Sequence, residues 1–302
     1  MCLVVSDILF EIEKINCSYK TSRRAVLEIE ELIINKNEVV FIIGPSGVGK
    51  STILETLGLM NNTINSTSSS KFNFCPNNFS IDMRRIWEKK ERELSEMRRH
   101  FFSFIFQSDN LFSSLTGYQN IIASSLIEGT DSNLAKRNAR IVLEDILKDL
   151  NSKDQEDFSI TEMSGGQKQR ISFARAITSN YQILFADEPT GNLDWYNAEL
   201  LMEYLIKSLA KSSGSSAIIV SHDIKLALDF ADKIIYIDKH SEEINKEEFY
   251  YGKISKDSVF IKSKENGDWS SNKQSFSREK LEKEIKMKFK GDSEKLKIKE
   301  VL

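Results

Sequence analysis

The stretch VVFIIGPSGVGKST, residues 39–52, decides the fold. Its first part, Val39–Ile43, is apolar and mostly β-branched, which predicts a strand buried on both faces. The next part, Gly44–Ser51, fits the pattern GxxxxGK[ST], which binds phosphate where it follows a strand and opens a helix. The sequence therefore predicts a strand, a phosphate-binding loop and a helix in this order, at the start of an α/β domain.

Each part of this loop has a physical reason. Glycines let backbone N–H groups turn toward phosphate oxygens, and the helix N-terminus adds positive potential. Lys50 reaches the β- and γ-phosphates of a nucleotide, and the Ser51 hydroxyl can ligate Mg²⁺. An ordinary glycine-rich turn is the alternative. The expected nucleotide-binding residues of this stretch are Gly44, Pro45, Ser46, Gly47, Val48, Gly49, Lys50, Ser51 and Thr52.

Two later apolar runs also end in polar residues. Ile183–Ala186 runs into Asp187 and Glu188, and Ala217–Val220 runs into Ser221 and His222. Repeated units of this kind predict a largely parallel sheet whose strand ends carry the site. Asp187 is placed to hold Mg²⁺ through its water shell, and Glu188 to polarise the attacking water. Taken alone, such a run is often only a strand entering a turn.

A third motif separates this chain from other phosphate-loop proteins. Ser164-Gly165-Gly166-Gln167, followed by Lys168-Gln169-Arg170, resembles the signature motif of ABC (ATP-binding cassette) ATPases. Other residues follow in the order of that family, over roughly residues 7–238. Gln107 resembles the Q-loop residue, Asp194 the D-loop residue, His222 the switch histidine and Tyr19 the aromatic residue that stacks on adenine. Without these neighbours, each would more often be an ordinary surface or core residue.

The resemblance implies the fold and the chemistry. The fold is a mostly parallel core sheet with an antiparallel β subdomain and a helical subdomain. ATP and Mg²⁺ are the implied cofactors, and a homodimer is implied because each ATP is held between the phosphate loop of one subunit and Ser164–Gln167 of the other. The implied catalytic residues are Glu188, His222 and Gln107, and the implied Mg²⁺ ligands are Ser51, Gln107 and Asp187.

The string ADEPTGNLD, residues 186–194, is similar to a subgroup of ATPases that serve lipoprotein release, macrolide export and cell division. This similarity implies a separate integral-membrane permease and export or extraction of a lipoprotein, peptide or drug-like substrate. One alternative is an ATP-driven signalling module that acts through a membrane partner in envelope or cell-division control. Another is a soluble family member that works on DNA or in translation.

The chain also departs from the family at one turn. The turn Asn35–Glu38 lacks the Pro-Gly usual in the family.

Composition narrows the setting. The formal net charge of -3 and pI near 5.8 give no basic footprint for nucleic acid, which is not expected as a partner. Three widely spaced cysteines suggest neither a disulfide framework nor a zinc site. The sequence has no apolar run of about 20 residues and no signal-peptide pattern at its start. We therefore expect a cytoplasmic protein, peripheral on the inner face of the cell membrane.

The chain divides into an expected ATPase domain, 1–240, and a charged C-terminal extension, 241–302. Within the first, Asn61–Ser80 is expected to be a loop, and Met83–Arg99 and Leu134–Leu150 helices. The extension ends in an expected helix, Ser277–Leu302, with Leu281, Ile285 and Phe289 on one stripe. A surface helix or partly disordered tail is one interpretation of this end, and a helix that docks on a partner or a membrane surface is the other.

Overall fold

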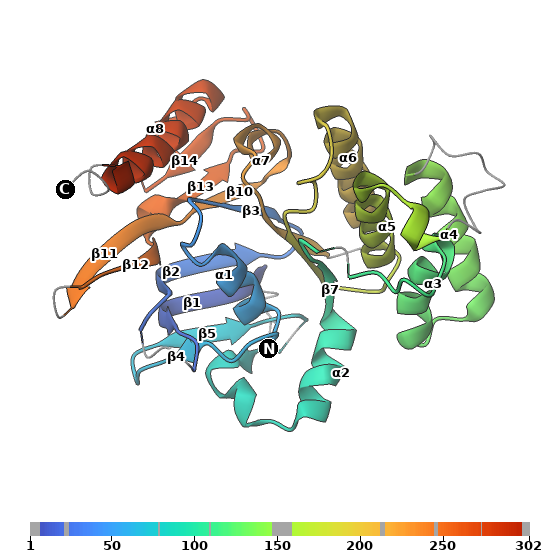
Figure 1. The fold of residues 1–302 in the computed structure, drawn as a ribbon. Coiled ribbons are helices and arrows are strands. Elements are labelled where there is room, and N and C mark those ends of the chain that lie inside the picture. The colour runs from blue at the N-terminus through green and yellow to red at the C-terminus, as the bar shows by residue number, and fades with distance from the viewer. Residues whose placement is uncertain are drawn as a thin grey trace. The chain divides into compact units, whose positions relative to one another are not determined.

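The computed structural model describes residues 7–20, 24–77, 79–108, 110–146, 159–211, 215–244, 247–272 and 274–297. These residues belong to two compact units (Figure 1). The first unit contains Met1–Leu94 and Val220–Leu302, and the second contains Ser95–Ile219.

The first unit contains an antiparallel sheet whose centre is β1 (Ile8–Cys17). This strand pairs with β2 (Leu27–Asn35) on one side and with β5 (Lys71–Phe74) on the other. Its side chains alternate between buried and exposed, and the Phe10 ring stacks on that of Phe74 with centroids 4.9 Å apart. The antiparallel β subdomain that the family resemblance implies is therefore confirmed.

The first unit also holds the strand that leads into the phosphate loop. β3 (Val39–Ile43) is buried along its whole length and pairs in parallel with β10 (Lys233–Tyr236). The helix α1 (Lys50–Leu57) follows the loop. On the far side of β10 the sheet continues with antiparallel strands, β13 (Val259–Lys262), β14 (Trp269–Ser271) and β15 (Gln274–Phe276).

The turn before β3 shows what replaces Pro-Gly. Asn37 adopts a left-handed backbone with φ 60°, which asparagine tolerates better than most residues. The Glu38 carboxylate accepts hydrogen bonds from the backbone N–H and side-chain amide of Asn35, at 3.0 and 2.7 Å. It also binds the buried Lys233 ammonium of β10 at 2.6 Å. An ion pair thus anchors the turn.

The segment expected to be a loop, Asn61–Ser80, contains strands. They are β4 (Ile64–Asn65) and β5, and β6 (Ile81–Asp82) follows and pairs with β5. In β5 the residues alternate between half-buried and buried. The many polar residues around this strand make the alternation hard to recognise in the sequence.

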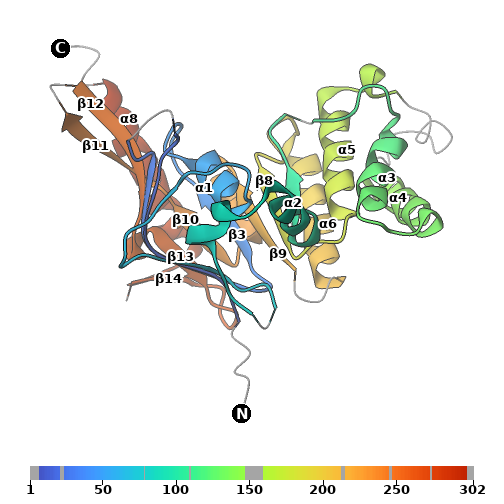
Figure 2. The ribbon, with the colours of Figure 1, turned by 90° about the horizontal axis from the view of Figure 1, so that it is seen from below.

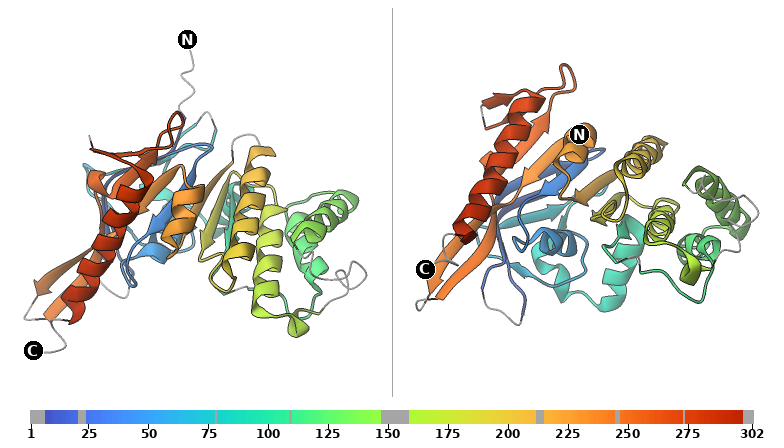
Figure 3. Two further views of the ribbon diagram at one scale, coloured as in Figure 1. Left: turned by 90° about the horizontal axis from the view of Figure 1, so that it is seen from above. Right: turned by 45° about the horizontal axis from the view of Figure 1, so that its top comes forward.

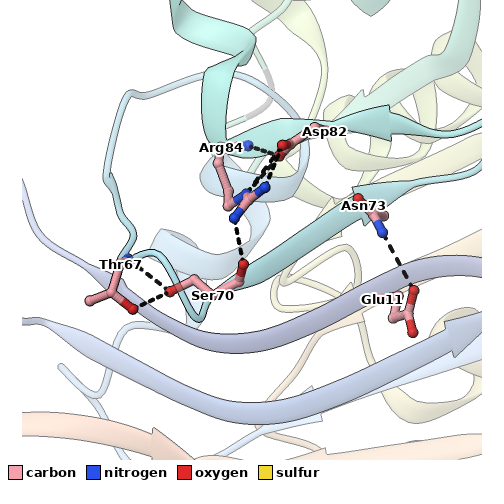
Figure 4. Close-up of polar contacts among 6 residues, drawn as sticks. All are labelled: Glu11, Thr67, Ser70, Asn73, Asp82 and Arg84. Atoms are coloured by element: carbon pink, nitrogen blue, oxygen red, sulfur yellow. Dashed lines mark hydrogen bonds and ion pairs between the residues drawn. The ribbon is translucent and has the colours of Figure 1, made fainter.

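Arg84 ties this polar segment together (Figure 4). Its guanidinium forms a two-pronged ion pair with Asp82, at 2.9 and 2.7 Å, and donates to the Ser70 carbonyl oxygen at 2.6 Å. The Ser70 hydroxyl accepts from the Thr67 N–H at 2.9 Å. Figure 4 also shows Asn73 of β5 pointing toward Glu11 of β1.

The single helix expected over Met83–Arg99 is interrupted. A 3₁₀ helix, η1 (Met83–Glu88), begins at Asp82, whose carboxylate accepts the Arg84 N–H. Lys89 is extended, with φ -73° and ψ 157°, and a separate helix, α2 (Glu91–Phe101), follows it.

The C-terminal segment is folded onto the first unit. β11 (Asp238–Ile244) and β12 (Glu247–Ile254) form a hairpin, and β12 pairs in parallel with β2. After a short 3₁₀ helix, η3 (Lys256–Ser258), and strands β13 to β15, the chain enters α8 (Arg278–Lys297). Figures 1 and 3 show α8 lying along α7 (Ile224–Phe230) and the C-terminal strands.

The predicted stripe of α8 faces inward. Leu281 and Ile285 are fully buried, and the Phe289 ring meets Tyr236 edge-on at 5.5 Å. Lys288 binds Asp238 at 2.7 Å. The helix is therefore docked on its own chain through this stripe, and residues 298–302 of the expected helix lie outside the described residues. The domain boundary at residue 240 stays a prediction.

The second unit combines strands with a group of helices (Figure 2). Its strand order is β9-β8-β7, and β7 (Phe102–Ile105) pairs in parallel with β8 (Ile183–Asp187). The two expected strands at 183–186 and 217–220 are therefore confirmed. The helix expected over Leu134–Leu150 is observed as α4 up to Ile146, and residues 147–150 lie outside the described residues. The remaining elements are β9 (Ser216–Val220), α3 (Gly117–Ile127), α4 (Ser132–Ile146), η2 (Ile160–Glu162), α5 (Gly165–Ile177) and α6 (Trp195–Lys211).

Among helices in the described part of the chain, none combines the length and apolar character needed to cross a bilayer.

Candidate functional site

The phosphate loop of the first unit adopts a conformation that glycine makes accessible. Gly47 and Gly49 have φ 77° and 91°, in the left-handed region, and Gly49 directly precedes α1. The Lys50 side chain folds back across the loop, where its ammonium donates to the carbonyl oxygens of Gly44 and Pro45 at 2.9 and 2.7 Å. The cation is thus held over the loop that the sequence predicts to bind phosphate.

The remaining loop residues differ in exposure. Ser51 is exposed at the start of α1, Thr52 is buried in its first turn, and Ser46 is exposed at the loop. Val48 points inward and is 1% exposed. A hydroxyl facing solvent at the helix N-terminus is where a ligand of phosphate-bound Mg²⁺ is needed.

Tyr19 lies beside this loop, after the end of β1. Its hydroxyl donates to the Glu55 carboxylate at 2.9 Å and lies 3.1 Å from the Thr52 hydroxyl, so both partners come from α1. Burial raises the pKa of Tyr19, and the hydroxyl stays a donor toward Glu55 at neutral pH. Asn61 also binds Glu55, at 2.8 Å. The half-buried ring is therefore fixed next to the phosphate loop.

His222 belongs to the same unit as the phosphate loop. It is the second residue after β9 and is exposed, while its neighbour Ser221 donates its N–H to the Ile42 carbonyl oxygen of β3 at 3.2 Å. Asp223 caps α7 by accepting the Leu226 N–H at 3.0 Å. His222 is thus held between a main-chain hydrogen bond of Ser221 and the side-chain cap of Asp223.

In the second unit, Asp187 ends β8 and Glu188 begins the following turn. Glu188 has φ 51°, a left-handed conformation that costs a non-glycine residue about 1–2 kcal/mol. Its carbonyl oxygen accepts from the Gly191 N–H at 3.2 Å and from the Gln169 side chain at 3.1 Å. The Gln169 amide oxygen accepts from the Asn192 N–H at 3.0 Å. One buried glutamine of α5 therefore clamps the turn that carries Glu188.

The signature motif opens α5 in the same unit. Ser164 caps the helix, because its hydroxyl accepts the Gln167 N–H at 3.3 Å and the Gln167 side chain accepts the Ser164 N–H at 2.9 Å. Gly165 has open space around it. A side chain at Gly166 would lie 3.2 Å from the Leu193 side chain, so glycine permits the D-loop to approach.

Asp194 of the D-loop caps α6. Its carboxylate accepts the backbone N–H and the side-chain amide of Asn197, at 2.9 and 2.7 Å. These hydrogen bonds hold the pKa of Asp194 below its ordinary value. The residue stays ionised at neutral pH.

Gln107 follows β7 and is exposed in the second unit. The loop it begins is held by α5, since Arg175 donates to the Asn110 carbonyl oxygen at 2.8 Å. Asn120 of α3 is fully buried and exchanges hydrogen bonds with the backbone of Phe112, at 2.8 and 3.1 Å.

The predicted residues therefore form two groups. The phosphate loop, Tyr19 and His222 lie in the first unit, whereas Gln107, Asp187, Glu188, the signature motif and Asp194 lie in the second. Sequence reasoning missed Gln169, Arg175 and Asn120, although Gln169 stands only two residues after the signature motif.

The proposed Mg²⁺ ligands suit that ion chemically. Ser51, Gln107 and Asp187 all offer oxygen donors. Within the described residues, no group of three or more His, Cys, Asp or Glu side chains forms a metal site. This donor set fits Mg²⁺, which keeps waters and takes phosphate oxygens rather than a complete protein cage.

Comparisons with known proteins agree with these motifs. A family model described as "ABC transporter" matches residues 27–191. The lipoprotein-releasing system ATP-binding protein LolD of Bacteroides fragilis is 34% identical over 212 residues, which are 70% of this chain and 90% of LolD. The macrolide export ATP-binding/permease protein MacB of Mannheimia succiniciproducens is 35% identical over 231 residues, 76% of this chain but only 33% of MacB.

A solved structure has the same fold. It is the dimeric post-hydrolysis state of the ATP-binding cassette MJ0796 bound to ADP and Pi. The match has a TM-score of 0.61 at 28% identity and covers 76% of this chain and 94% of that one.

Proposed function

This chain belongs to the ABC transporter family, and from that premise we propose that it is the ATP-hydrolysing subunit of a transporter with a separate membrane-spanning permease. The coverage supports a separate permease. LolD, an ATP-binding protein by name, is matched over 90% of its length, whereas MacB, an ATP-binding/permease protein by name, is matched over 33%.

The observation that carries the proposal is the placement of Lys50. Its ammonium donates to the carbonyl oxygens of Gly44 and Pro45, in a loop where Gly47 and Gly49 adopt left-handed backbone conformations. On nucleotide binding the same ammonium exchanges these carbonyls for the β- and γ-phosphate oxygens of ATP. In this proposal the Ser51 hydroxyl, Asp187 and Gln107 would hold Mg²⁺, and the ion would supply positive charge to the phosphates.

Hydrolysis needs a base for the attacking water, and Glu188 is that base in this proposal. The clamp by Gln169 supports this role, because a strained backbone that the surrounding structure over-determines is typical of catalytic positions. His222 assists at the γ-phosphate, and Tyr19 stacks on adenine.

The proposed active form is a homodimer. Ser164 to Gln167 present a capped helix N-terminus that can accept the phosphates of ATP bound to the other subunit. The dimeric state of the MJ0796 structure, with ADP and Pi, supports this arrangement. Asp194 belongs to the same interface.

The proposed partner is a permease, and the proposed location is the inner face of the cell membrane. The names of LolD and MacB, lipoprotein release and macrolide export, favour export or extraction of a lipoprotein, peptide or drug-like molecule.

Two variants test the ATPase. Glu188→Gln removes the base but keeps the size and planarity of the side chain, so we expect ATP affinity to be retained and kcat to fall by about 100-fold. Lys50→Ala removes the main cation for the phosphates, so we expect loss of ATP affinity by calorimetry. Normal turnover of Glu188→Gln, or normal ATP affinity of Lys50→Ala, contradicts these roles.

The partner is tested by affinity purification of tagged Glu188→Gln protein from detergent-solubilised membranes with ATP. Recovery of a polytopic membrane protein supports the proposal, and substrate-stimulated ATPase in vesicles separates transport from signalling. Recovery with ribosomes or DNA alone contradicts it.

A further inference from the structure

In the β11–β12 hairpin, strand β12 lies directly against the phosphate loop. Gly252 of β12 is buried, and a side chain there would overlap the carbonyl oxygen of Val48, the residue between Gly47 and Gly49. The same side chain would lie 2.6 Å from Ile237. Glycine at position 252 is therefore required for this strand to lie directly against the backbone of the phosphate loop.

The same strand also holds the chain that leads into β2. Gly252 donates its N–H to the Val26 carbonyl oxygen at 2.9 Å and pairs with Leu27 in the parallel register. Val26 and Leu27 in turn pack on the loop, since a side chain at Gly49 would lie 3.3 and 3.2 Å from them. Residues 26 and 27 are thus layered between β12 and Gly49.

A second contact lies further up the hairpin. The Arg24 guanidinium carbon lies 3.3 Å from the centroid of the Phe249 ring, which is close for a cation–π contact. Arg24 stands two residues before Val26 and five after Tyr19, the proposed adenine-stacking residue. Phe249 therefore fixes Arg24, which leads into Val26 and Leu27 beside the phosphate loop.

We propose that the β11–β12 hairpin is part of the nucleotide-binding apparatus, with Phe249 and Gly252 as positioning residues that set the affinity for ATP through Arg24, Val26 and Val48. This inference rests on the proposed ATPase function and adds a role for residues after 240. The hairpin carries none of the proposed catalytic groups, so it affects ATP binding and leaves the chemical step unchanged.

The hairpin offers a matched control beside Phe249. Tyr250 is the next residue, points to the opposite face of the strand and is 40% exposed. Its hydroxyl donates to Glu248 at 3.0 Å, and the Lys239 ammonium lies 4.2 Å from the centroid of its ring, so both of these contacts lie within the hairpin. Tyr250→Leu therefore removes an aromatic ring of this strand without touching Arg24.

The test measures Kd for Mg·ATP by calorimetry, with KM, kcat and Tm, on the full chain. Phe249→Leu keeps an apolar side chain but removes the ring face, so we expect Kd and KM to rise about three- to fivefold, the size of one cation–π contact, with kcat unchanged. Phe249→Tyr keeps an aromatic ring at this position and should keep the wild-type Kd. Tyr250→Leu should leave Kd unchanged.

A double-mutant cycle isolates the pair. If Arg24 and Phe249 act together, Arg24→Leu and Phe249→Leu combined raise Kd no more than either alone. Gly252→Ala should raise Kd about tenfold, since an added methyl group displaces Val48.

Wild-type Kd in Phe249→Leu, or equal losses in Phe249→Leu and Tyr250→Leu, overturns the inference while leaving the ATPase proposal intact. A loss of kcat at unchanged Kd also overturns it. A wild-type chain that binds no Mg·ATP refutes the proposed function, and the inference with it.

Discussion

Replacing Gln169 with methionine tests whether the turn at Glu188 depends on a side chain of the signature helix. Gln169 is 3% exposed, and its amide bridges the Glu188 carbonyl oxygen and the Asn192 N–H. Methionine fills similar space without either hydrogen bond.

The size of the effect follows from the partners that are lost. Asn192 is exposed, so water can replace the lost acceptor, and loss of this hydrogen bond costs about 0.5–1.5 kcal/mol. The Glu188 carbonyl oxygen keeps the Gly191 N–H, so loss of the second donor costs about 1 kcal/mol. The turn is therefore destabilised by about 1.5–2.5 kcal/mol, and Glu188 can leave its left-handed conformation. Recovering that conformation at a cost of about 2 kcal/mol slows hydrolysis about 30-fold.

Steady-state ATPase kinetics measure the outcome. We expect kcat of Gln169→Met to fall about 30-fold with KM within about twofold. Ser172→Ala is the control on the same helix, because the described residues offer the buried Ser172 hydroxyl no hydrogen-bond partner. It should keep wild-type kcat. A Gln169→Met protein with lower Tm but wild-type kcat refutes the positioning argument.

Two further predictions concern stability. Glu38→Gln leaves the Lys233 ammonium, 2% exposed, without its anion, so we expect urea unfolding to show a loss of about 3 kcal/mol, largely recovered in Glu38→Gln/Lys233→Met. Normal stability of the single variant contradicts this. Burial raises the pKa of Cys17 from 9.0 to about 11, so the folded thiol holds its proton where the unfolded one ionises. Stability from this group is complete below pH 9.0 and decreases from there toward about 11, a decrease that Cys17→Ala should abolish in pH-dependent unfolding.

Local sequence patterns account for the residues that open helices and loops. The phosphate loop, the cap at Ser164 and the strand before Asp187 are each encoded within about ten residues. Gln169 and Arg175 escaped prediction because their partners, Glu188 and Asn110, lie 19 and 65 positions away. A single sequence does not show which backbone atom a distant side chain will reach.

The C-terminal segment was harder to predict for another reason. Its charged residues occupy the exposed sides of strands, so period-two alternation is weak and the sequence resembles a solvated tail. The run Phe249-Tyr250-Tyr251 is the signal that favours a strand there. For the same reason, the polar residues of the segment 61–80 led to the prediction of a loop where β5 is observed.

Helix α5 contacts three separate turns of the second unit. Gln169 holds the turn of Glu188, Gly166 receives Leu193, and Arg175 holds the loop after Gln107. In the proposed dimer the first residues of this helix meet the ATP of the other subunit, so a subunit that senses its neighbour's nucleotide adjusts its own catalytic carboxylate. Thermodynamic linkage makes this effect reciprocal. If ATP at one site changes the ATP affinity of the other site by some factor, ATP at the second site changes the affinity of the first by the same factor. We therefore expect the two sites of the dimer to bind and hydrolyse ATP cooperatively. A dimer with one Gln169→Met subunit should show a lower Hill coefficient for ATP.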